Sequence, residues 1–387
     1  MEVTGAREVV TSGAVHVLSS APSTDYPVLV RQGILDELDR LVETYARAHR
    51  YAVIADTIVG RLYGDRAVHA LGRTGRPVSL LTFPAGEENK NREQWETLTD
   101  ALLAEGFGRD SAVVALGGGV TGDLAGFVAA TFLRGIPVVQ VPTSLVAMVD
   151  SSVGGKTGVD TAAGKNLVGS FHPPRVVAAD PELVGTLPRS ERAQGLAEAV
   201  KHGAILDAGY LGFLEGESAS LLDGDPGLIE RAVQRSVEIK ADVVSRDERE
   251  GGLRQVLNFG HTLGHALEAS SSFLLAHGSA VSVGMILEAR LGESMGITEA
   301  GTEDRLWGAL SAFELPTSVP RGIDPADALA FSRSDKKARG GVVRFVLLAR
   351  PGEVSRDPET GWSRQVPDDL VAELLDREID AAQGDDP

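Results

Sequence analysis

Apolar residues in the first half of the chain form short runs that alternate with longer amphipathic segments. Runs of strand length occupy residues 26–34, 51–56, 77–83, 111–119 and 135–143. Residues 34–49 and 92–107 instead carry apolar side chains at helical spacing. Because strands that alternate with helices usually pair in parallel, this pattern predicts an α/β sheet.

The pattern changes near residue 188. Residues 191–206, 228–248 and 280–296 have helical periodicity, with little strand signal between them. Residues 340–354 predict a small hairpin, and residues 366–387 an acidic amphipathic helix. We therefore expect an α/β, Rossmann-like nucleotide-binding domain over residues 1–188 and a mainly α-helical domain over residues 189–387.

Composition narrows the function classes. The 387-residue chain is 43% hydrophobic and carries a formal net charge of −18, which argues against a nucleic-acid-binding surface. With no cysteine, it has no disulfide, thiolate metal site or thiol nucleophile. The N-terminus lacks the apolar core of a signal peptide, and the sequence lacks an apolar run long enough to span a membrane. We expect a cytoplasmic protein without membrane or nucleic-acid partners.

A glycine-rich turn, GGGVTGD at residues 117–123, stands between an apolar strand and a predicted helix. Backbone N–H groups in such a turn can approach a phosphate, and the helix N-terminus favours its negative charge. Asp56 ends the strand 51–56, where an acid can bind a ribose hydroxyl, and GEENK at 86–90 also follows a strand. The turn departs from the usual GxGxxG pattern, and a purely structural turn is the alternative.

Residues 148–174 combine glycines with polar side chains: Asp150, Lys156, Lys165 and Asn166. Glycine-rich loops with spaced lysines suit an anionic small molecule approached by the backbone. The alternative is a long mobile surface loop.

Polar side chains also recur among apolar residues of the helical half. Glu198 and Lys201 are three residues apart, which predicts one helix face and, as the alternative, a surface ion pair. From Arg254 through Asn258 to His265, polar residues recur at helical spacing, which predicts a cleft-facing stripe if the helix extends back to Arg254. Lys240 and Glu250 precede this stripe.

Three histidines suggest a metal centre. His261 and His265 are four residues apart, and His277 follows in the same half. Thr262 after His261 excludes the HExxH metalloprotease pattern. With Glu198, these histidines give four candidates for a three-ligand zinc site with an open position, and spacing does not choose among them.

Taken together, the motifs resemble the 3-dehydroquinate synthase family of sugar phosphate cyclases. The resemblance runs from about residue 26 to residue 354. Its motifs are GGGVTGD, VPTSL, VDSSVGGKTGVD, GKNLVGSFHPP, TLPRSE, GLAEAVKHG, NFGHTLGHALE and DKKARGG. The resemblance implies a dehydroquinate synthase-like two-domain fold, a lyase of the shikimate pathway to chorismate and aromatic amino acids, NAD, one divalent metal ion (zinc or cobalt) and a homodimer.

The resemblance also assigns roles. It makes Glu198, His261 and His277 the metal ligands, so the i, i+4 histidine pair splits between two roles. The implied NAD contacts are Asp56, Glu87, Lys90, Gly118, Gly119, Asp123, Thr143, Ser144, Lys156, Lys165 and Thr186.

The implied substrate is 3-deoxy-D-arabino-heptulosonate 7-phosphate, an anionic sugar-acid phosphate. Transient oxidation by NAD, phosphate elimination, re-reduction, ring opening and an intramolecular aldol step would give 3-dehydroquinate. The resemblance implies that the phosphate is bound by Lys156, Asn166, Asn258, His265 and Lys336. It also implies that Lys240 and Arg254 bind the carboxylate and that Asp150 and Lys201 lie on either side of the reacting hydroxyls. Glu250 is expected in the same site, and Arg134 is expected to reach the site of a neighbouring subunit.

One departure from the family pattern follows His277. The family usually reads HGEAV, whereas this chain reads HGSAV with Ser279, which affects support of the metal ligands rather than the ligands themselves. The alternatives are sibling cyclases, such as aminodehydroquinate synthase, 2-epi-5-epi-valiolone synthase or 2-deoxy-scyllo-inosose synthase. A metal-dependent alcohol dehydrogenase and a catalytically silent scaffold are two further classes.

Overall fold

A computed structural model describes residues 13–18, 25–271, 274–324, 327–328, 330–331 and 343–384. The chain forms two compact units: residues 1–187 with 226–248, and residues 188–225 with 249–387. The first division falls between residues 187 and 188. Residues 226–248, which the sequence places in the second domain, group with the first unit instead.

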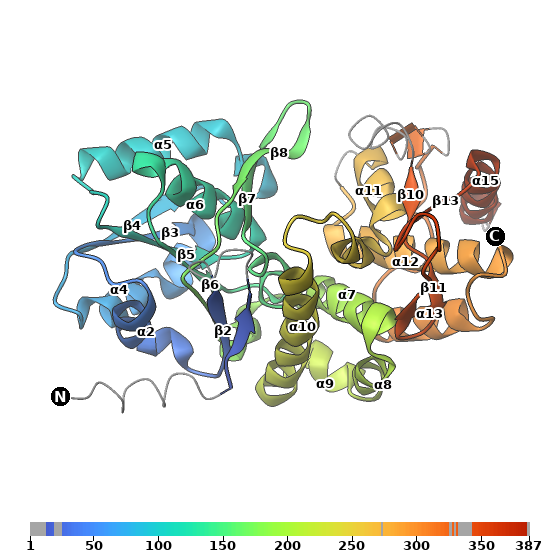
Figure 1. The fold of residues 1–387 in the computed structure, drawn as a ribbon, viewed down its shortest axis with the longest axis horizontal. Coiled ribbons are helices and arrows are strands. Elements are labelled where there is room, and N and C mark those ends of the chain that lie inside the picture. Colours follow the sequence, from blue (N-terminus) through green and yellow to red (C-terminus); the bar gives the residue numbers. More distant parts are fainter. Residues whose placement is uncertain are drawn as a thin grey trace. The chain divides into compact units, whose positions relative to one another are not determined.

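The first unit is built on a seven-stranded sheet (Figure 1). In spatial order the strands are β1 (Val15–Val17), β2 (Tyr26–Val30), β9 (Val176–Ala179), β6 (Val138–Pro142), β5 (Ala112–Gly117), β3 (Tyr51–Asp56) and β4 (Val78–Phe83). All neighbours are parallel except β1 and β2. Strands β5, β6 and β9 are buried along their whole length, which explains their continuous apolar runs.

Helices flank this sheet. Helices α5 (Arg92–Ala104) and α6 (Gly119–Thr131) share an apolar core with β3, β4 and β5, in which Leu98, Leu102, Leu124 and Val128 are buried. Helices α2 (Leu38–Tyr45) and α4 (Asp65–Gly72) contact each other, and α4 also contacts β3 and β4. The alternating pattern of the sequence therefore gave the right α/β class.

Two segments of the first unit differ from expectation. Helix α10 (Pro226–Arg246) packs against β1, β2 and the short helices η6 (Ala147–Ser151) and η7 (Pro181–Thr186), which explains why it belongs to this unit. The glycine-rich stretch forms an antiparallel hairpin of β7 (Lys156–Thr161) and β8 (Gly164–Phe171), where the sequence suggested a loop.

The second unit is mainly helical. Its helices are α7 (Arg189–Leu206), α8 (Ala208–Gly216), α9 (Ser218–Asp223), η8 (Leu253–Asn258), α11 (His261–Ser270), α12 (His277–Ser294), α13 (Thr302–Ala312) and α15 (Asp368–Gly384). Two short antiparallel pairs join β10 (Arg344–Phe345) to β13 (Arg364–Gln365) and β11 (Leu348–Arg350) to β12 (Glu353–Val354). The second pair and α15 confirm the expected late hairpin and terminal helix.

The predicted polar stripe is not one helix. The helix η8 ends at Asn258, and α11 begins at His261 after Gly260, whose φ is +77°. A Cβ on Gly260 would lie 2.5 Å from the Met285 side chain of α12, so glycine is required both by the backbone and by the packing. Arg254 and His265 therefore lie on separate helices.

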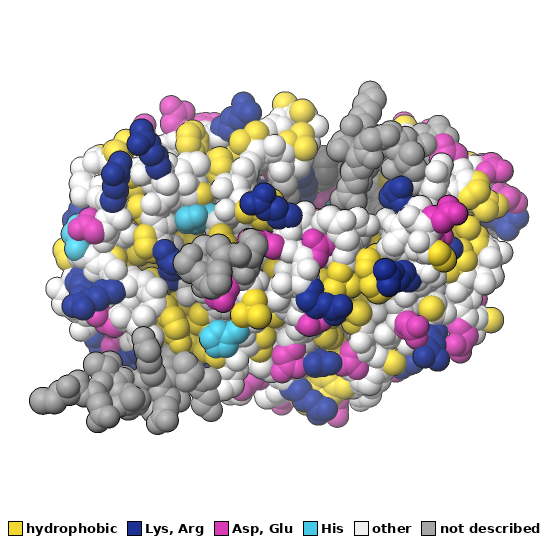
Figure 2. Space-filling view, viewed as in Figure 1, with side chains coloured by type: hydrophobic (Ala, Val, Ile, Leu, Met, Phe, Trp, Pro, Cys, Tyr) yellow, Lys and Arg dark blue, Asp and Glu magenta, His cyan; other side chains and the backbone are white. Residues whose placement is uncertain are grey.

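None of the helices in the described part of the chain is both long enough and apolar enough to cross a membrane. On the face of the molecule drawn in Figure 2, acidic and basic side chains are interspersed, so the charge there is mixed in sign.

Candidate functional site

The carboxyl ends of β3 and β5 define a switch point in the sheet. Strand β4 pairs on one side of β3, while β5 and then β6 continue on the other side. Ligands of open α/β sheets bind outside the carboxyl ends of the strands at such a point. Asp56 ends β3 and Gly117 ends β5, so the acid and the glycine turn that the sequence singled out meet at this edge.

The turn after β5 is tightly packed. A Cβ on Gly117 would lie 2.3 Å from Thr121 Oγ1, and one on Gly118 would lie 3.1 Å from Ser144 Oγ. Gly118 is the N-cap of α6 without a side-chain cap, so the first N–H groups of this helix receive no capping side chain. Asp56 accepts hydrogen bonds from the backbone N–H groups of Ile58 and Val59 through one oxygen, and its other oxygen lies 3.5 Å from Thr121 Oγ1.

A buried lysine organises the acidic side of this edge. Lys90 Nζ lies 2.7 Å from Glu87 Oε1, 3.4 Å from Asp123 Oδ2 and 3.7 Å from Asp160 Oδ1. Burial raises the pKa of Asp123 to about 6, although the Lys90 ammonium opposes the shift. Lys165 Nζ lies 3.7 Å from Glu87 Oε1. The structure thus brings together four predicted nucleotide contacts and adds Asp160, which the sequence analysis missed.

The remaining predicted nucleotide contacts have their own partners. The backbone N–H of Thr143 donates to Gly117 O at 2.9 Å, and Ser144 Oγ accepts from the Ala147 N–H at 3.3 Å. Thr186 Oγ1 lies 2.7 Å from the Tyr63 hydroxyl.

Predicted substrate residues of the first unit include one close ion pair. Lys240 Nζ, on α10, lies 2.7 Å from Asp150 Oδ1 and donates to Asp150 O at 2.6 Å. Lys156 begins β7, and Asn166 in β8 has a φ of +55°, with its N–H donating to Asp160 Oδ1 at 2.8 Å. Arg134 is exposed, with a φ of +74°.

In the second unit, three helices bring a carboxylate and two imidazoles together. Glu198 of α7 is fully buried, and its Oε1 lies 3.3 Å from His277 Nε2 and 3.5 Å from His261 Nε2. Two ligands about 2.0–2.1 Å from a tetrahedral zinc ion would lie about 3.3–3.4 Å apart. The donor set and spacing therefore fit one divalent metal ion.

A second group shares His277. His265, Glu268 and His277 also have potential ligand atoms within 4.8 Å of one another, as do Glu198, His261 and His277. His277 Nδ1 lies 3.6 Å from Glu268 Oε2, on the opposite side of the ring from Glu198. A carboxylate in this place orients a ligating imidazole, so Glu268 fits a supporting role. The sequence analysis missed Glu268, although it lies seven residues after His261 on the same helix.

The two imidazoles next to Glu198 have opposite pKa shifts. Burial, followed by the nearby Lys201 ammonium, lowers the pKa of His261 well below its usual value. Burial works against protonation of His277, but Glu198 and Glu268 outweigh it and raise its pKa to about 10. Without metal, His261 is therefore neutral and His277 protonated at neutral pH, so an incoming metal must displace a proton.

Other predicted residues of the second unit lie around these helices. Lys201 forms a buried ion pair with Glu198 Oε2. Asn258 Nδ2 donates to Glu250 Oε1 at 2.8 Å, and Arg254 is 3% exposed in η8. Lys336 lies outside the described residues.

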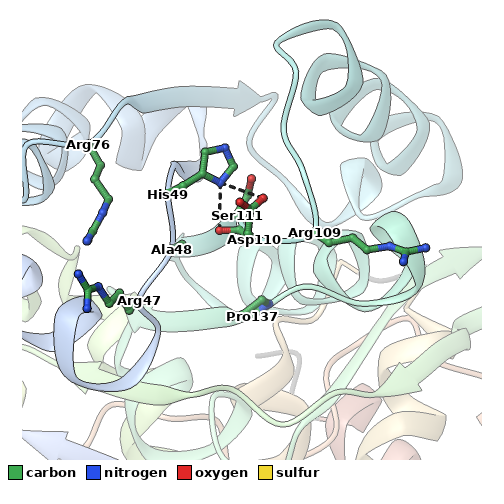
Figure 3. Close-up of a pocket in the computed structure, with 8 residues that line it drawn as sticks. All are labelled: Arg47, Ala48, His49, Arg76, Arg109, Asp110, Ser111 and Pro137. Carbon is green, nitrogen blue, oxygen red and sulfur yellow. Dashed lines mark hydrogen bonds and ion pairs between the residues drawn. The ribbon is translucent and has the colours of Figure 1, made fainter.

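One cavity lies elsewhere in the first unit. It has a volume of about 410 Å³ and is lined by residues preceding the strands, including Arg76, His49 and Arg109. Figure 3 shows His49 paired with Asp110, the Arg47 and Arg76 guanidinium groups turned toward one another, and Arg109 extending away. The cavity is therefore at the amino edge of the sheet, opposite the glycine turn.

A parallel sheet with a glycine turn at its switch point, and a helical unit with a Glu–His–His cluster, are typical of a dinucleotide- and metal-dependent enzyme. The N-terminal model of the 3-dehydroquinate synthase family matches residues 80–194, and its C-terminal model matches residues 195–338. The 3-dehydroquinate synthase of Symbiobacterium thermophilum is 49% identical over 336 residues, covering 86% of this chain and 94% of that protein. That of Pelobacter propionicus is 46% identical, covering 83% and 89%. The chain belongs to the 3-dehydroquinate synthase family.

Solved structures agree on the fold. A 2-deoxy-scyllo-inosose synthase complexed with carbaglucose-6-phosphate, NAD⁺ and Co²⁺ has a TM-score of 0.86 at 27% identity, covering 94% of this chain and all of that one. The 2-epi-5-epi-valiolone synthase ValA from Streptomyces hygroscopicus, with NAD⁺ and Zn²⁺ bound, has a TM-score of 0.84 at 27% identity, covering 94% and 99%. These similarities confirm the predicted fold class.

Proposed function

We propose that the protein converts 3-deoxy-D-arabino-heptulosonate 7-phosphate to 3-dehydroquinate and phosphate, using NAD and one divalent metal ion. The observation that carries the proposal is 49% identity, over 86% of the chain, to a 3-dehydroquinate synthase. The two sibling cyclase structures compared above are each 27% identical to this chain. When bound, the nucleotide supplies a reversible hydride acceptor and the metal supplies a Lewis acid for the hydroxyl that is oxidised.

The first unit would hold the nucleotide at the carboxyl edge of its sheet. Asp56 has a carboxylate at the end of β3, where it can accept from a ribose hydroxyl. The backbone of Gly118 and Gly119 begins α6 without a capping side chain, which leaves N–H groups for a pyrophosphate. Lys90 would hold the side chains beside this nucleotide site in place, because its ammonium group interacts with three carboxylates.

The metal ligands would be Glu198, His261 and His277, supported by the spacing of their ligand atoms. Lys201 keeps a positive charge beside Glu198 and would stabilise an oxygen that gains negative charge during oxidation. Glu268 would hold the His277 ring by its other nitrogen.

Binding of the anionic substrate requires cations and amide donors. Arg254 carries a buried guanidinium suited to a carboxylate, while Asn258 and His265 would serve the phosphate. Lys240 and Asp150 form an ion pair in which the ammonium can donate hydrogen bonds to substrate hydroxyls and the carboxylate can accept hydrogen bonds from them. Because the hydride removed from the substrate returns later, these residues have mainly to hold one conformation and neutralise charge.

A turnover assay tests the proposal. The purified protein would receive 3-deoxy-D-arabino-heptulosonate 7-phosphate, NAD⁺ and Co²⁺ or Zn²⁺, with phosphate, carbocycle and absorbance at 340 nm followed together. We expect equal amounts of phosphate and 3-dehydroquinate, no net NADH, and loss of activity on chelation that metal restores. Turnover of only amino or sedoheptulose substrates would indicate a sibling cyclase, and steady NADH release a dehydrogenase.

A homodimer is part of the proposal. Arg134 is exposed in the short helix η5 (Phe132–Arg134) that follows α6, and it would complete the site of a second subunit. Mixing an Arg134→Ala variant with a His277→Ala variant should restore part of the activity that each variant lacks. No restoration from dimers shown to exchange subunits would contradict the shared site. The cytoplasmic location stays a prediction.

A further inference from the structure

The N-terminus of α12, which carries His277, lacks a capping side chain of its own. Its N-cap residue is Ala276, whose methyl group accepts no hydrogen bond. The N–H of Ser279, at the third helical position, instead donates to Gln194 Oε1 of α7 at 2.8 Å. Gln194 Nε2 in turn donates to Ser279 Oγ at 3.0 Å. The backbone donor fixes the orientation of the amide, so the two hydrogen bonds form a reciprocal clasp between the helices.

The backbones of the two helices also touch at the clasp. A Cβ on Gly278 would lie 2.4 Å from Gln194 O and 2.6 Å from Gln194 Cα. Such a contact leaves no space for a side chain at position 278, so the close approach of α7 and α12 at this point requires glycine. The helix axes are therefore fixed by contact as well as by hydrogen bonds.

The clasp lies next to two of the three proposed metal ligands. Gln194 precedes Glu198 by four residues, which places both on one face of α7 about one turn, or about 5.4 Å, apart. Ser279 follows His277 by two residues within the first turn of α12. Glu198 Oε1 lies 3.3 Å from His277 Nε2, so a shift between the helices at the clasp would change this ligand spacing directly.

We propose that Gln194 is a positioning residue of the metal centre, which it aligns by capping α12 through Ser279. The inference rests on the proposed function, because it assumes that Glu198 and His277 hold a metal ion. In this proposal Gln194 acts through Ser279 and His277 and is not itself a ligand. It supplies from α7 the capping acceptor that Ala276 cannot provide.

The test compares Gln194→Ala, Gln194→Glu and a matched control, Glu293→Ala. Glu293 of α12 accepts a hydrogen bond from the Glu303 N–H at 2.7 Å, so it also caps a helix, α13, from another helix. Helix α13 carries no proposed ligand. The readouts are Co²⁺ affinity by competition with a chelator, the visible spectrum of bound Co²⁺, NAD⁺ affinity and thermal unfolding of the metal-free protein.

We expect Gln194→Ala to weaken Co²⁺ binding about 10–100-fold, the usual cost of losing a partner that orients a ligand. Gln194→Glu should restore affinity to within a few-fold of wild type, because a carboxylate accepts from both the Ser279 N–H and the Ser279 hydroxyl. Glu293→Ala should lower the unfolding temperature without changing Co²⁺ affinity or its spectrum. NAD⁺ affinity should be the same in all variants.

Three outcomes would overturn the inference in different ways. If the wild-type protein binds Co²⁺ and Gln194→Ala binds it equally well with an unchanged spectrum, Gln194 has only a structural role and the proposed function stands. If Gln194→Ala and Glu293→Ala lose affinity equally, the effect is general destabilisation and the inference is wrong. If the wild-type protein binds no metal, the proposed metal centre fails and this inference fails with it.

Discussion

Replacement of single histidines distinguishes the two overlapping groups that could hold a metal. In the first group, Glu198 Oε1 lies 3.5 Å from His261 Nε2 and 3.3 Å from His277 Nε2, close to the separation of about 3.3–3.4 Å expected for tetrahedral zinc ligands. In the second group, His265 and Glu268 take the places of His261 and Glu198. His261→Ala and His265→Ala therefore have opposite expected effects in the two cases.

The expected loss of metal affinity follows from the number of ligands removed. His261→Ala removes one of three ligands, and losing a residue that only supports a ligand already costs about 10–100-fold in metal affinity. We therefore expect a loss of more than about 100-fold for His261→Ala. The ring of His265 is 5.1 Å from that of His261 between centroids and more exposed, so His265→Ala should keep metal affinity within a few-fold while impairing turnover.

The assay is titration of the metal-free protein with Co²⁺, followed in the visible spectrum and by chelator competition. His49→Ala is the matched control, because His49 also pairs with a carboxylate, Asp110, at 3.0 Å but belongs to the first unit. Retention of tight binding in His261→Ala, together with its loss in His265→Ala, would refute the assignment and favour the second group. Equal losses in all three variants would mean that the titration detects unspecific binding.

Three further predictions concern the rest of the molecule. Burial raises the pKa of Glu288, from 4.5 in a model peptide to about 8, so its contribution to stability is fully present below pH 4.5 and is lost as pH rises through 8. The loss is at most about 5 kcal/mol, at about 1.4 kcal/mol per pH unit. In urea unfolding of the metal-free protein, the free energy of unfolding of Glu288→Gln should therefore fall less between pH 6 and 9 than that of the wild type. An equal fall in both proteins would count against a buried neutral Glu288. A Cβ in Gly117→Ala would lie 2.3 Å from the Thr121 side chain. Calorimetric titration should therefore show NAD⁺ binding at least about tenfold weaker, by about 1.4 kcal/mol or more, with Co²⁺ affinity unchanged. Normal NAD⁺ affinity would mean that the nucleotide binds elsewhere. Lys240→Met leaves the partly buried Asp150 carboxylate without the ammonium at 2.7 Å. The free energy of unfolding, measured by thermal unfolding, should fall by about 1–3 kcal/mol. Adding Asp150→Asn should recover part of that loss, and full additivity of the two effects would mean that the pair is not coupled.

The sequence predicted the parts of the fold that depend on local pattern. Continuous apolar runs gave the buried strands β5 and β6, and the glycines between β5 and α6 gave the turn at the switch point. Helix α10 was assigned to the wrong unit because its amphipathic pattern shows that it packs on an apolar surface, but not on which one. The β7–β8 hairpin was missed because its exposed strand β8 carries glycines and a lysine rather than an alternating apolar pattern.

Similar limits apply to the metal centre. Four candidate ligands were evident from residue type, yet spacing alone left open which three would meet, because the choice depends on how α7, α11 and α12 pack. In the structure the Glu198 carboxylate lies within 4.0 Å of both His261 and His277. Distances between helices therefore support the same three ligands that the family resemblance implies.

Ser279 shows what a motif comparison leaves unexplained. Read as a departure from the family pattern, it put the support of the metal ligands in question rather than the ligands themselves. In the structure its N–H and hydroxyl both bond to Gln194, a residue 85 positions earlier that no local pattern connects to it. The hydrogen-bond partner of Ser279 thus comes from α7, the same helix that carries Glu198. Loss of the Gln194 side chain would leave both the N–H and the hydroxyl of Ser279 without this partner, whereas a substitution at Ser279 would remove only the hydrogen bond to its hydroxyl, because the backbone N–H remains.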